Sequence, residues 1–515
     1  MGKLVPKLNS LDDVYVGASA GDSVPTDLRH RFEDLVSSFQ SKYSAKADFV
    51  SRSPGRVNII GEHIDYSLYD CLPTAVTVDV LIATRVVKDK TGESTIKIAN
   101  VNSTKYPSKV YTIPSSGTVE VDKANHAWSN YFLAGLKGSL PYLREKLGES
   151  FKPQSMEILV DGNVPSGGGL SSSAAFVCAS ALAVMAANNY DISKQDLLDL
   201  CIVSERAVGV FSGGMDQAAS IFSERGYLLY CHFFPKFSAE HVPVPVSDPE
   251  VTFLIAQSFV TSDKAVTAPI HYNLRVVEVT LATVVLAKLH DIALNPDDSS
   301  LGFCLRNFQE EIMKKEGRRD EPMADQIKSV IDIINAKLDK DSYTLDDVAD
   351  ILGISVDEVK RQYLSKFPIR ADSFKLRQRA LHVLEEAERV HQFKDVLSTS
   401  GKLDQEKLLH LGDLMNRTQI SCKDVYECSC QEVDDICSIA RKAGAYGSRL
   451  TGAGWGGCTV HLVPQKNVAA VTEALKKEYY FEKYPDISEE KLREAFVISK
   501  PSQGSSLIVG SALDF

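Results

Sequence analysis

The chain has 515 residues, of which 44% are hydrophobic and 24% are charged. This is the composition of an ordinary folded protein, and the length predicts two or more domains. The formal net charge of −11 provides no positive surface for nucleic acid or for an anionic membrane. We therefore expect a small-molecule substrate, with no nucleic acid and no membrane as partner.

The N-terminal and apolar segments predict a cytoplasmic protein. Residues 1–6 lack the apolar stretch of a signal peptide and the Ser or Thr that a myristoylation motif requires. The longest apolar stretches, such as residues 279–289, are much shorter than the roughly 20 residues that span a bilayer. Ten cysteines are too few for a disulfide scaffold, and Cys71, Cys178 and Cys201 lie in apolar runs typical of core thiols. A reducing compartment is expected.

A group of cysteines near the C-terminus raises the question of a metal site. Its members are Cys422, Cys428, Cys430 and Cys437. They lack paired C-x2-C spacing and have no nearby histidine. We interpret them as structural cysteines on helices.

Hydrophobic periodicity in the first half predicts a helix packed on a sheet. Apolar residues recur at helical spacing over residues 28–43. Alternating patterns predict strands at residues 57–60, 81–87 and 156–160. An alanine-rich helix without internal Gly or Pro is predicted over residues 171–188. The first lobe is therefore expected to be rich in sheet.

A boundary between two lobes is predicted near the middle of the chain. Further strands are predicted at residues 226–234 and 252–256, and the stretch between them contains a proline-rich segment at 243–249. This segment suggests a division into residues 1–242 and residues 243–515.

The second lobe begins with helical patterns and ends with strands. A helix is predicted over residues 272–289, a charged helical region over about 295–400, and a strand over 459–463. Within the helical region, residues 343–363 have the pattern of two short helices joined at Gly353, as in a helix-turn-helix. Five acidic side chains in this pair argue against contact with a phosphate backbone.

A glycine- and serine-rich loop between a predicted strand and a predicted helix is the strongest local signal. Residues 164–175 read VPSGGGLSSSAA. Three glycines allow close approach of a polyanion, and the start of the helix supplies free N–H groups and a partial positive charge. The loop is not a Walker A motif, because no Lys follows the last glycine. We expect it to bind phosphate, while a turn that merely caps the helix is the alternative.

Ionisable side chains crowd a glycine turn after the first predicted strand. Residues 53–66 read SPGRVNIIGEHIDY. Carboxylates and an imidazole within four residues suit the recognition of neighbouring hydroxyl groups, as in a sugar. Two further segments, GGMDQ at 213–217 and LTGAGWGGC at 450–458, are ambiguous by themselves because such glycine turns are common.

Taken in chain order, these segments resemble the signature of galactokinases, which belong to the GHMP small-molecule kinase superfamily. The first family motif reads close to GRVNLIGEHTDY, and residues 55–66 match it. The resemblance continues through the serine-rich loop, the GGMDQ segment and the closing glycine motif at 451–457, over nearly the whole chain. It is closest to fungal galactokinases and their transcription-inducer relatives.

The resemblance implies a two-lobed α+β fold with the active site in the cleft between the lobes. It implies transfer of the terminal phosphoryl group of ATP to the anomeric hydroxyl of galactose in galactose catabolism, the Leloir pathway, with ATP and Mg²⁺ as cofactors. The sugar-binding residues implied are Arg56, Glu62, His63, Asp65, Gly213, Asp216 and Tyr272. The nucleotide-binding residues implied are Gly167, Gly169, Ser171, Ser172, Asp263 and Lys264, and the magnesium ligands are Ser173 and Glu205.

The resemblance also implies catalytic roles for Asp216 and Arg56. Asp216 is expected to accept a proton from the anomeric hydroxyl, and Arg56 to stabilise negative charge on Asp216 and on the transferred phosphoryl group. Because an aspartate with a pKa of about 3.9 is a poor base toward an alcohol, positioning and charge stabilisation are expected to supply much of the catalysis. Ile64 and residues 67–69 depart from the family pattern, so a different shape is expected for the loop over the sugar.

Two other functions remain open from the sequence. One is a galactose- and ATP-sensing inducer that binds a transcriptional repressor and has little kinase activity. Relatives of that kind carry a short deletion in the serine-alanine part of the phosphate loop, which is intact here at residues 171–175. The other is a kinase for N-acetylgalactosamine. Neither a repressor partner nor the oligomeric state can be decided from the sequence.

Overall fold

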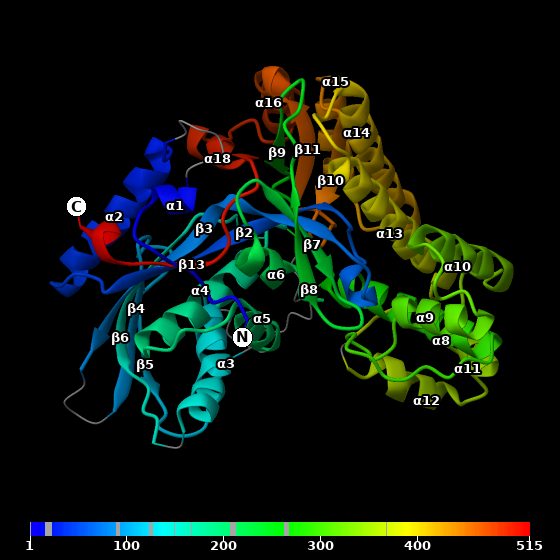
Figure 1. Ribbon diagram of the computed structural model, residues 1–515, viewed down its shortest axis with the longest axis horizontal. Helices are drawn as coiled ribbons and strands as arrows, with labels where there is room; N and C mark the ends of the chain where they lie inside the picture. The colour runs from blue at the N-terminus through cyan, green and yellow to red at the C-terminus, as the bar shows by residue number, and fades with distance from the viewer. Residues whose placement is uncertain are drawn as a thin grey trace.

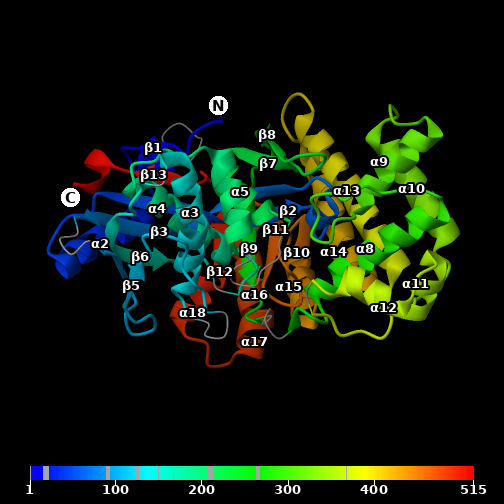
Figure 2. The same ribbon diagram turned by 90° about the horizontal axis from the view of Figure 1, so that it is seen from below.

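The computed structural model consists of three parts that follow one another along its long axis (Figures 1 and 2). A seven-stranded sheet with helices on both faces lies on the left in Figure 1, a four-stranded sheet lies above the centre, and a group of helices lies on the right. The structure describes residues 2–15, 23–88, 93–122, 127–148, 150–165, 167–205, 213–261, 267–366 and 368–514. The described residues form both sheets and helices, which confirms the predicted α+β class.

The large sheet is built around two long antiparallel strands. Its strands are, in order across the sheet, β1 (Lys7–Leu8), β13 (Ser506–Ile508), β2 (Phe49–Ile60), β3 (Leu72–Val87), β6 (Ser155–Gly162), β4 (Ser94–Asn100) and β5 (Lys109–Ile113). Strands β2, β3 and β6 contain the three strand segments predicted from alternation. Every residue of β2 is buried, which is what coverage on both faces requires.

Helices cover both faces of this sheet. The helices on one face are α3 (Asn130–Leu147), α4 (Ser172–Ala187), α5 (Lys194–Glu205) and α6 (Met215–Phe222), and those on the other face are α1 (Asp12–Tyr15) and α2 (Thr26–Tyr43). Alternate residues of β3 serve the two faces: Val80 and Ile82 pack in the cluster with α4, while Leu81 and Ala83 pack in the cluster with α2. The predicted helices at 28–43 and 171–188 are thereby confirmed as α2 and α4.

The smaller sheets belong to the middle of the molecule. The four-stranded sheet has the order β10 (Gly447–Thr451), β11 (Cys458–Pro464), β9 (Val251–Gln257), β12 (Phe496–Ser499), and all its pairs are antiparallel. Helices α15 (Gln431–Lys442) and α16 (Val468–Leu475) pack against it, with the short helices α17 (Phe481–Lys483) and α18 (Glu489–Glu494) nearby. A separate hairpin consists of β7 (Tyr227–His232) and β8 (Ser238–Pro243).

The charged region predicted at about 295–400 is helical and leads back to the sheets. Its helices are α9 (Leu305–Glu316), α10 (Met323–Lys337), α11 (Leu345–Leu352), α12 (Val356–Val359) and α13 (Leu376–Ser398). Helix α8 (Tyr272–Leu289), predicted separately at 272–289, precedes this region, and α14 (Gln405–Ile420) follows it. Helices α11 and α12 are the pair predicted on either side of Gly353, where φ is +72°. The long helix α13 runs from this group toward the end of β2 (Figure 1).

The two ends of the described chain meet in the large sheet. Strand β13, near the C-terminus, pairs in parallel with β1 and antiparallel with β2. The division into residues 1–242 and 243–515 stays a prediction, and the return of β13 shows that the second part of the chain also contributes to the first sheet. Among the described residues, no helix combines the length and the hydrophobicity needed to cross a bilayer.

Two glycine-rich loops pack backbone against backbone where the large sheet meets the four-stranded one. A β-carbon added at Gly169 would lie 2.6 Å from the carbonyl oxygen of Thr451, and one added at Gly452 would lie 2.5 Å from the carbonyl oxygen of Gly169. A β-carbon added at Gly457 would lie 3.2 Å from the carbonyl carbon of Gly168. No side chain can be inserted at this contact without moving one of the loops.

We expect Gly452→Ala to lower the free energy of unfolding much more than Gly401→Ala. Both glycines have similar backbone angles, with φ of +92° and +97°, so alanine pays a conformational cost of about 1–2 kcal/mol at either position. Only Gly452 also meets backbone atoms, since an added β-carbon at Gly401 has nothing within 4 Å. Overpacking should therefore cost Gly452→Ala about 1–3 kcal/mol more. Urea unfolding of both variants measures this difference, and equal losses would contradict the described contact.

Candidate active site

Residues 53–66, which we call the sugar motif after their expected role, end in a tight turn after β2. We call this turn, at residues 61–65, the sugar turn. Gly61 has a φ of +106° and His63 a φ of +60°, and the one-turn helix η1 (Asp65–Ser67) follows. A β-carbon at Gly61 would lie 3.0 Å from Cα of Cys71, so this position requires glycine both for its backbone angle and for its space. The turn directs several polar side chains into the region between the sheets.

Arg56 and Asp216 form an ion pair beside the glycine- and serine-rich loop at residues 164–175, which we call the phosphate loop after its expected role. Arg56 lies on β2. Its Nε donates to Oδ1 of Asp216 at 2.8 Å, and its Nη2 lies 2.7 Å from the same oxygen. Asp216 lies in the first turn of α6, after Gly214. The Nη1 group of Arg56 also donates to the carbonyl oxygen of Gly169. Burial alone would lower the pKa of Arg56, but the carboxylates of Asp216 and Glu62 raise it, so the guanidinium remains charged.

Asp65 is a buried carboxyl group near the same pair. Its side chain packs against the backbone of Gly213, where a β-carbon would collide with Oδ2 of Asp65. Burial and the charge of Asp216 raise the pKa of Asp65 from 3.8 to about 6. Only a residue without a side chain fits at Gly213, which explains the glycine in the GGMDQ segment.

The other polar residues of the turn are held by the closing glycine motif. Oε2 of Glu62 accepts hydrogen bonds from Nη2 of Arg449 and, at 3.1 Å, from the N–H of Gly452. Nε2 of His63 lies 3.0 Å from the carbonyl oxygen of Ala453. One oxygen of Glu62 is thus engaged within the protein. Sequence reasoning did not identify Arg449, because a lone arginine in a strand carries no signal of its own.

Aromatic rings line the same region. The ring centroid of His63 lies 5.4 Å from that of Tyr272, the first residue of α8, and Tyr66 lies 5.6 Å from Tyr272. The Tyr66 and Tyr426 hydroxyl groups are hydrogen-bonded to each other. Tyr272 is therefore brought next to the sugar motif although more than 200 residues separate them in sequence.

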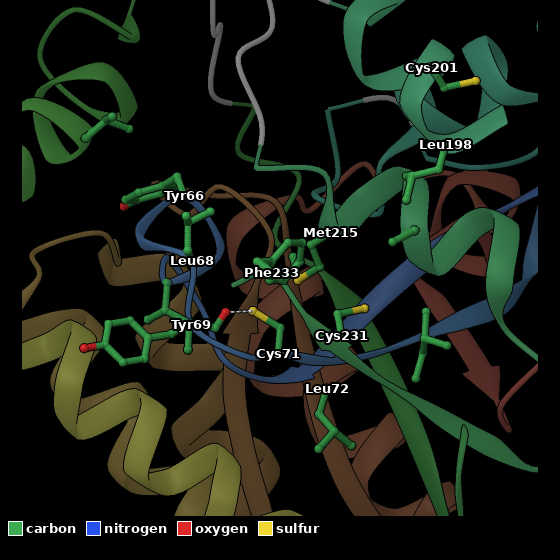
Figure 3. Packing of buried hydrophobic residues seen from close by; sticks show 14 of the residues in the cluster. Tyr66, Leu68, Tyr69, Cys71, Leu72, Leu198, Cys201, Met215, Cys231 and Phe233 are labelled. Atoms are coloured by element: carbon green, nitrogen blue, oxygen red, sulfur yellow. Dashed lines mark hydrogen bonds between the residues drawn. The ribbon is translucent and has the colours of Figure 1, made fainter. Parts of the chain in front are cut away.

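The loop at residues 67–69, which departs from the family pattern, is packed into the interior. Leu68 and Tyr69 are 7% and 2% exposed and belong to the hydrophobic cluster that also contains Cys71 and Cys231 (Figure 3). The hydroxyl of Tyr69 donates to Oε1 of Gln309 on α9 at 2.7 Å. Leu68 and Tyr69 therefore anchor this loop to the hydrophobic interior, and Tyr69 also links it to the helical region.

The phosphate loop ends in a helix start that has no side-chain cap. Gly167 and Gly169 have φ of +71° and +75°, and Ser171, the residue before α4, has a φ of +58° and makes no capping hydrogen bond. The hydroxyl-bearing residues Ser171, Ser172 and Ser173 are all partly exposed. The first N–H groups of α4 are thus directed to the loop, an arrangement that suits an anion.

The residues expected to bind magnesium lie on neighbouring helices. Ser173 is in the first turn of α4, and Glu205 is the last residue of α5, which packs against α4. Oε2 of the buried Glu205 accepts a hydrogen bond from Nε2 of Gln217. Asp263 and Lys264 lie outside the described residues. Within the described part of the chain, no three acidic, histidine or cysteine residues form a group that could hold a metal ion.

An aromatic group lies close to the start of α4 and was not identified from the sequence. The rings of Trp128 and Phe176 are nearly parallel, with centroids 6.2 Å apart, and Tyr131 lies 6.0 Å from Phe176. Phe176 is one turn from Ser172. All three rings are partly exposed, so they offer apolar surface near the start of α4. Three isolated aromatic residues give no local motif by which to recognise such a surface.

Comparison with known families agrees with this arrangement. The family described as "Galactokinase galactose-binding signature" matches residues 37–86 of this chain. The families "GHMP kinases N terminal domain" and "GHMP kinases C terminal" match residues 130–224 and 402–480. The galactokinase of Saccharomyces cerevisiae is 40% identical to this chain over 528 aligned positions, which cover 98% of each protein. This chain belongs to the galactokinase family of GHMP kinases.

Other galactokinases extend the comparison. The galactokinase of Schizosaccharomyces pombe is 37% identical and covers 94% of this chain and 96% of its own length. The crystal structure of Lactococcus lactis galactokinase complexed with galactose superimposes with a TM-score of 0.66, at 23% identity, over 92% of this chain and 99% of that one. The similarity to the bacterial structure confirms the two-lobed GHMP kinase fold.

We expect Asp65→Asn to stabilise the protein at neutral pH. A carboxyl group whose folded-state pKa is raised favours folding when protonated, and this contribution is lost as the pH rises from about 4 to about 6. Removing the charge should increase the free energy of unfolding by about 2 kcal/mol at pH 7.5 and by little at pH 4.

Asp79→Asn is the matched control, because Arg52 and Arg31 outweigh burial and lower the pKa of Asp79. That variant should be destabilised at pH 7.5. Urea unfolding at the two pH values measures both effects. A loss of stability in Asp65→Asn at pH 7.5 would contradict the described environment of Asp65.

Proposed function

We propose that this protein is a galactokinase that transfers the terminal phosphoryl group of ATP to the anomeric hydroxyl of α-D-galactose and produces galactose 1-phosphate. Family membership over nearly the whole chain supports this activity. The observation that carries the proposed mechanism is the ion pair of Arg56 and Asp216 next to the phosphate loop.

The geometry suggests how the two substrates are held. The polar turn at residues 61–65, with Asp216, Gly213 and Tyr272, is proposed to bind galactose through hydrogen bonds to its hydroxyl groups. Gly167, Gly169, Ser171 and Ser172 are proposed to bind the phosphates of ATP, aided by the free N–H groups of α4. The partly exposed rings near Phe176 offer a stacking surface for the purine. Roles for Asp263 and Lys264 at the nucleotide stay predictions.

Asp216 is proposed to accept the proton of the attacking hydroxyl. Its charge is paired with Arg56, so its basicity is modest, and proton transfer should accompany phosphoryl transfer rather than precede it. Arg56 can stabilise negative charge on both sides of the transfer, since its guanidinium reaches Asp216 and the phosphate loop at once. The rest of the rate enhancement is proposed to come from side chains that hold neutral galactose in position for the reaction.

The oxygen donors expected near the phosphate loop suit Mg²⁺. The hydroxyl of Ser173 and the carboxylate of Glu205 are oxygen ligands, which this ion prefers. When bound, the ion would neutralise charge on the phosphates.

A cytoplasmic location, a sensing role toward a transcriptional repressor and activity on N-acetylgalactosamine also stay predictions.

We expect Asp216→Asn to lose about 100- to 10,000-fold in kcat while its affinity for ATP stays near the wild-type value, because the substitution removes the proton acceptor without changing the phosphate loop. Asp413→Asn, at an exposed position on α14, serves as the control and should retain full activity. Steady-state kinetics at saturating galactose, combined with calorimetric binding of ATP, measures both quantities. Near-normal turnover of Asp216→Asn would refute the catalytic assignment.

A further inference from the structure

The backbone of the sugar turn is bound by a buried carboxylate from helix α13. Oε1 of Glu386 accepts hydrogen bonds from the N–H groups of Gly61 at 2.8 Å and of Glu62 at 3.0 Å. Glu386 is 0% exposed and lies 324 residues from Glu62 in sequence. A charged acceptor between two successive N–H groups makes stronger hydrogen bonds than a neutral one.

The second oxygen of Glu386 is fixed by its own partners. Oε2 accepts from Nε of Arg389 at 2.8 Å and from the hydroxyl of Thr418 at 2.7 Å. Although burial opposes the charge, Arg389 and Arg449 lower the pKa of Glu386 to about 2, so it is ionised at neutral pH. The carboxylate therefore has two donors on each oxygen and little freedom to move.

His382, one helical turn before Glu386, holds the other side of the same turn. Its Nε2 lies 3.0 Å from the carbonyl oxygen of Glu62, and its Nδ1 lies 2.9 Å from the hydroxyl oxygen of Ser421. Burial lowers the pKa of His382 to about 3, so the ring is neutral. Since the carbonyl can only accept, Nε2 carries the proton and Nδ1 accepts from Ser421.

The spacing of these residues explains why one helix can make all the contacts. His382, Glu386 and Val390 are four residues apart and therefore share one face of α13. On this face, Val390 would lie 3.1 Å from a β-carbon added at Gly61. Three successive peptide groups, from 60–61 to 62–63, and the space beside Gly61 are thus in contact with α13.

We propose that Glu386 and His382 are positioning residues that fix the turn carrying Glu62, His63 and Asp65 and thereby set the affinity of the enzyme for its sugar. This inference rests on the proposed function, because it assumes that the turn binds galactose. It also assigns a role to the charged helical region, because α13 supplies the residues that hold the sugar turn.

Glu386→Gln tests the inference with nearly unchanged volume. An amide can present one oxygen, but its NH2 group must then face donors, either the two backbone N–H groups or Arg389 and Thr418. The turn should therefore shift or loosen. We expect KM for galactose to rise about 10- to 100-fold, because this is the loss of affinity that the removal of a hydrogen bond to a charged group produces. His382→Gln should raise it in the same direction. KM for ATP should stay within about 2-fold, because no hydrogen bond among the described residues joins Glu386 or His382 to the phosphate loop.

Glu388→Gln on the same helix is the control, since Glu388 is partly exposed and contacts only Gln392 among the described hydrogen bonds. Circular dichroism and thermal unfolding establish that each variant is folded, and His382→Gln carries the test if Glu386→Gln does not fold. A variant with a lower melting temperature and both KM values unchanged would overturn the inference, because that result indicates a purely structural role. Absence of galactose phosphorylation by the wild-type protein would instead refute the proposed function.

Discussion

The contact between Gly169 and Gly452 is the constraint on which the rest of the site depends. It joins the loop before α4 to the loop between β10 and β11, and no side chain separates the two backbones. Because of this contact, Gly452 can donate to Glu62 while Gly169 accepts from Arg56. The phosphate loop and the sugar turn are therefore held in register by two glycine loops that lie nearly 300 residues apart in the sequence.

Charge balance explains why so many partners surround the sugar turn. Three carboxylates, those of Glu62, Asp65 and Asp216, are gathered in one region, and their mutual repulsion opposes folding. Arg56 and Arg449 each neutralise one of them, whereas Asp65 is left without a cationic partner among the described hydrogen bonds and has a raised pKa. Contacts from outside the turn must offset this repulsion. Helix α13 provides such contacts, because Glu386 and His382 form hydrogen bonds with the backbone of the turn.

The sequence predicted the parts of the structure that are encoded locally. Strand β2 and helix α4 follow from short-range hydrophobic patterns, and Arg56 and Asp216 were placed together by family motifs that the structure brings into contact. Glu386 could not be found in this way, because it is one acidic residue in a helix rich in charge and its partners are distant in sequence. Its burial distinguishes it from the nearby acidic residues Glu385 and Glu388, which are partly exposed, and this burial arises only when the helices pack around the turn.

The account is tested most directly by identifying the product of the wild-type protein. Purified protein would be incubated with ATP, Mg²⁺ and galactose, and the reaction followed by phosphorus and carbon NMR. We predict equal amounts of ADP and galactose 1-phosphate, with phosphorus coupled to the anomeric carbon of the α-anomer and with no product when galactose is omitted. Phosphorylation at another hydroxyl, or binding of galactose and ATP without turnover, would contradict the proposal that Arg56 and Asp216 catalyse transfer to the anomeric position.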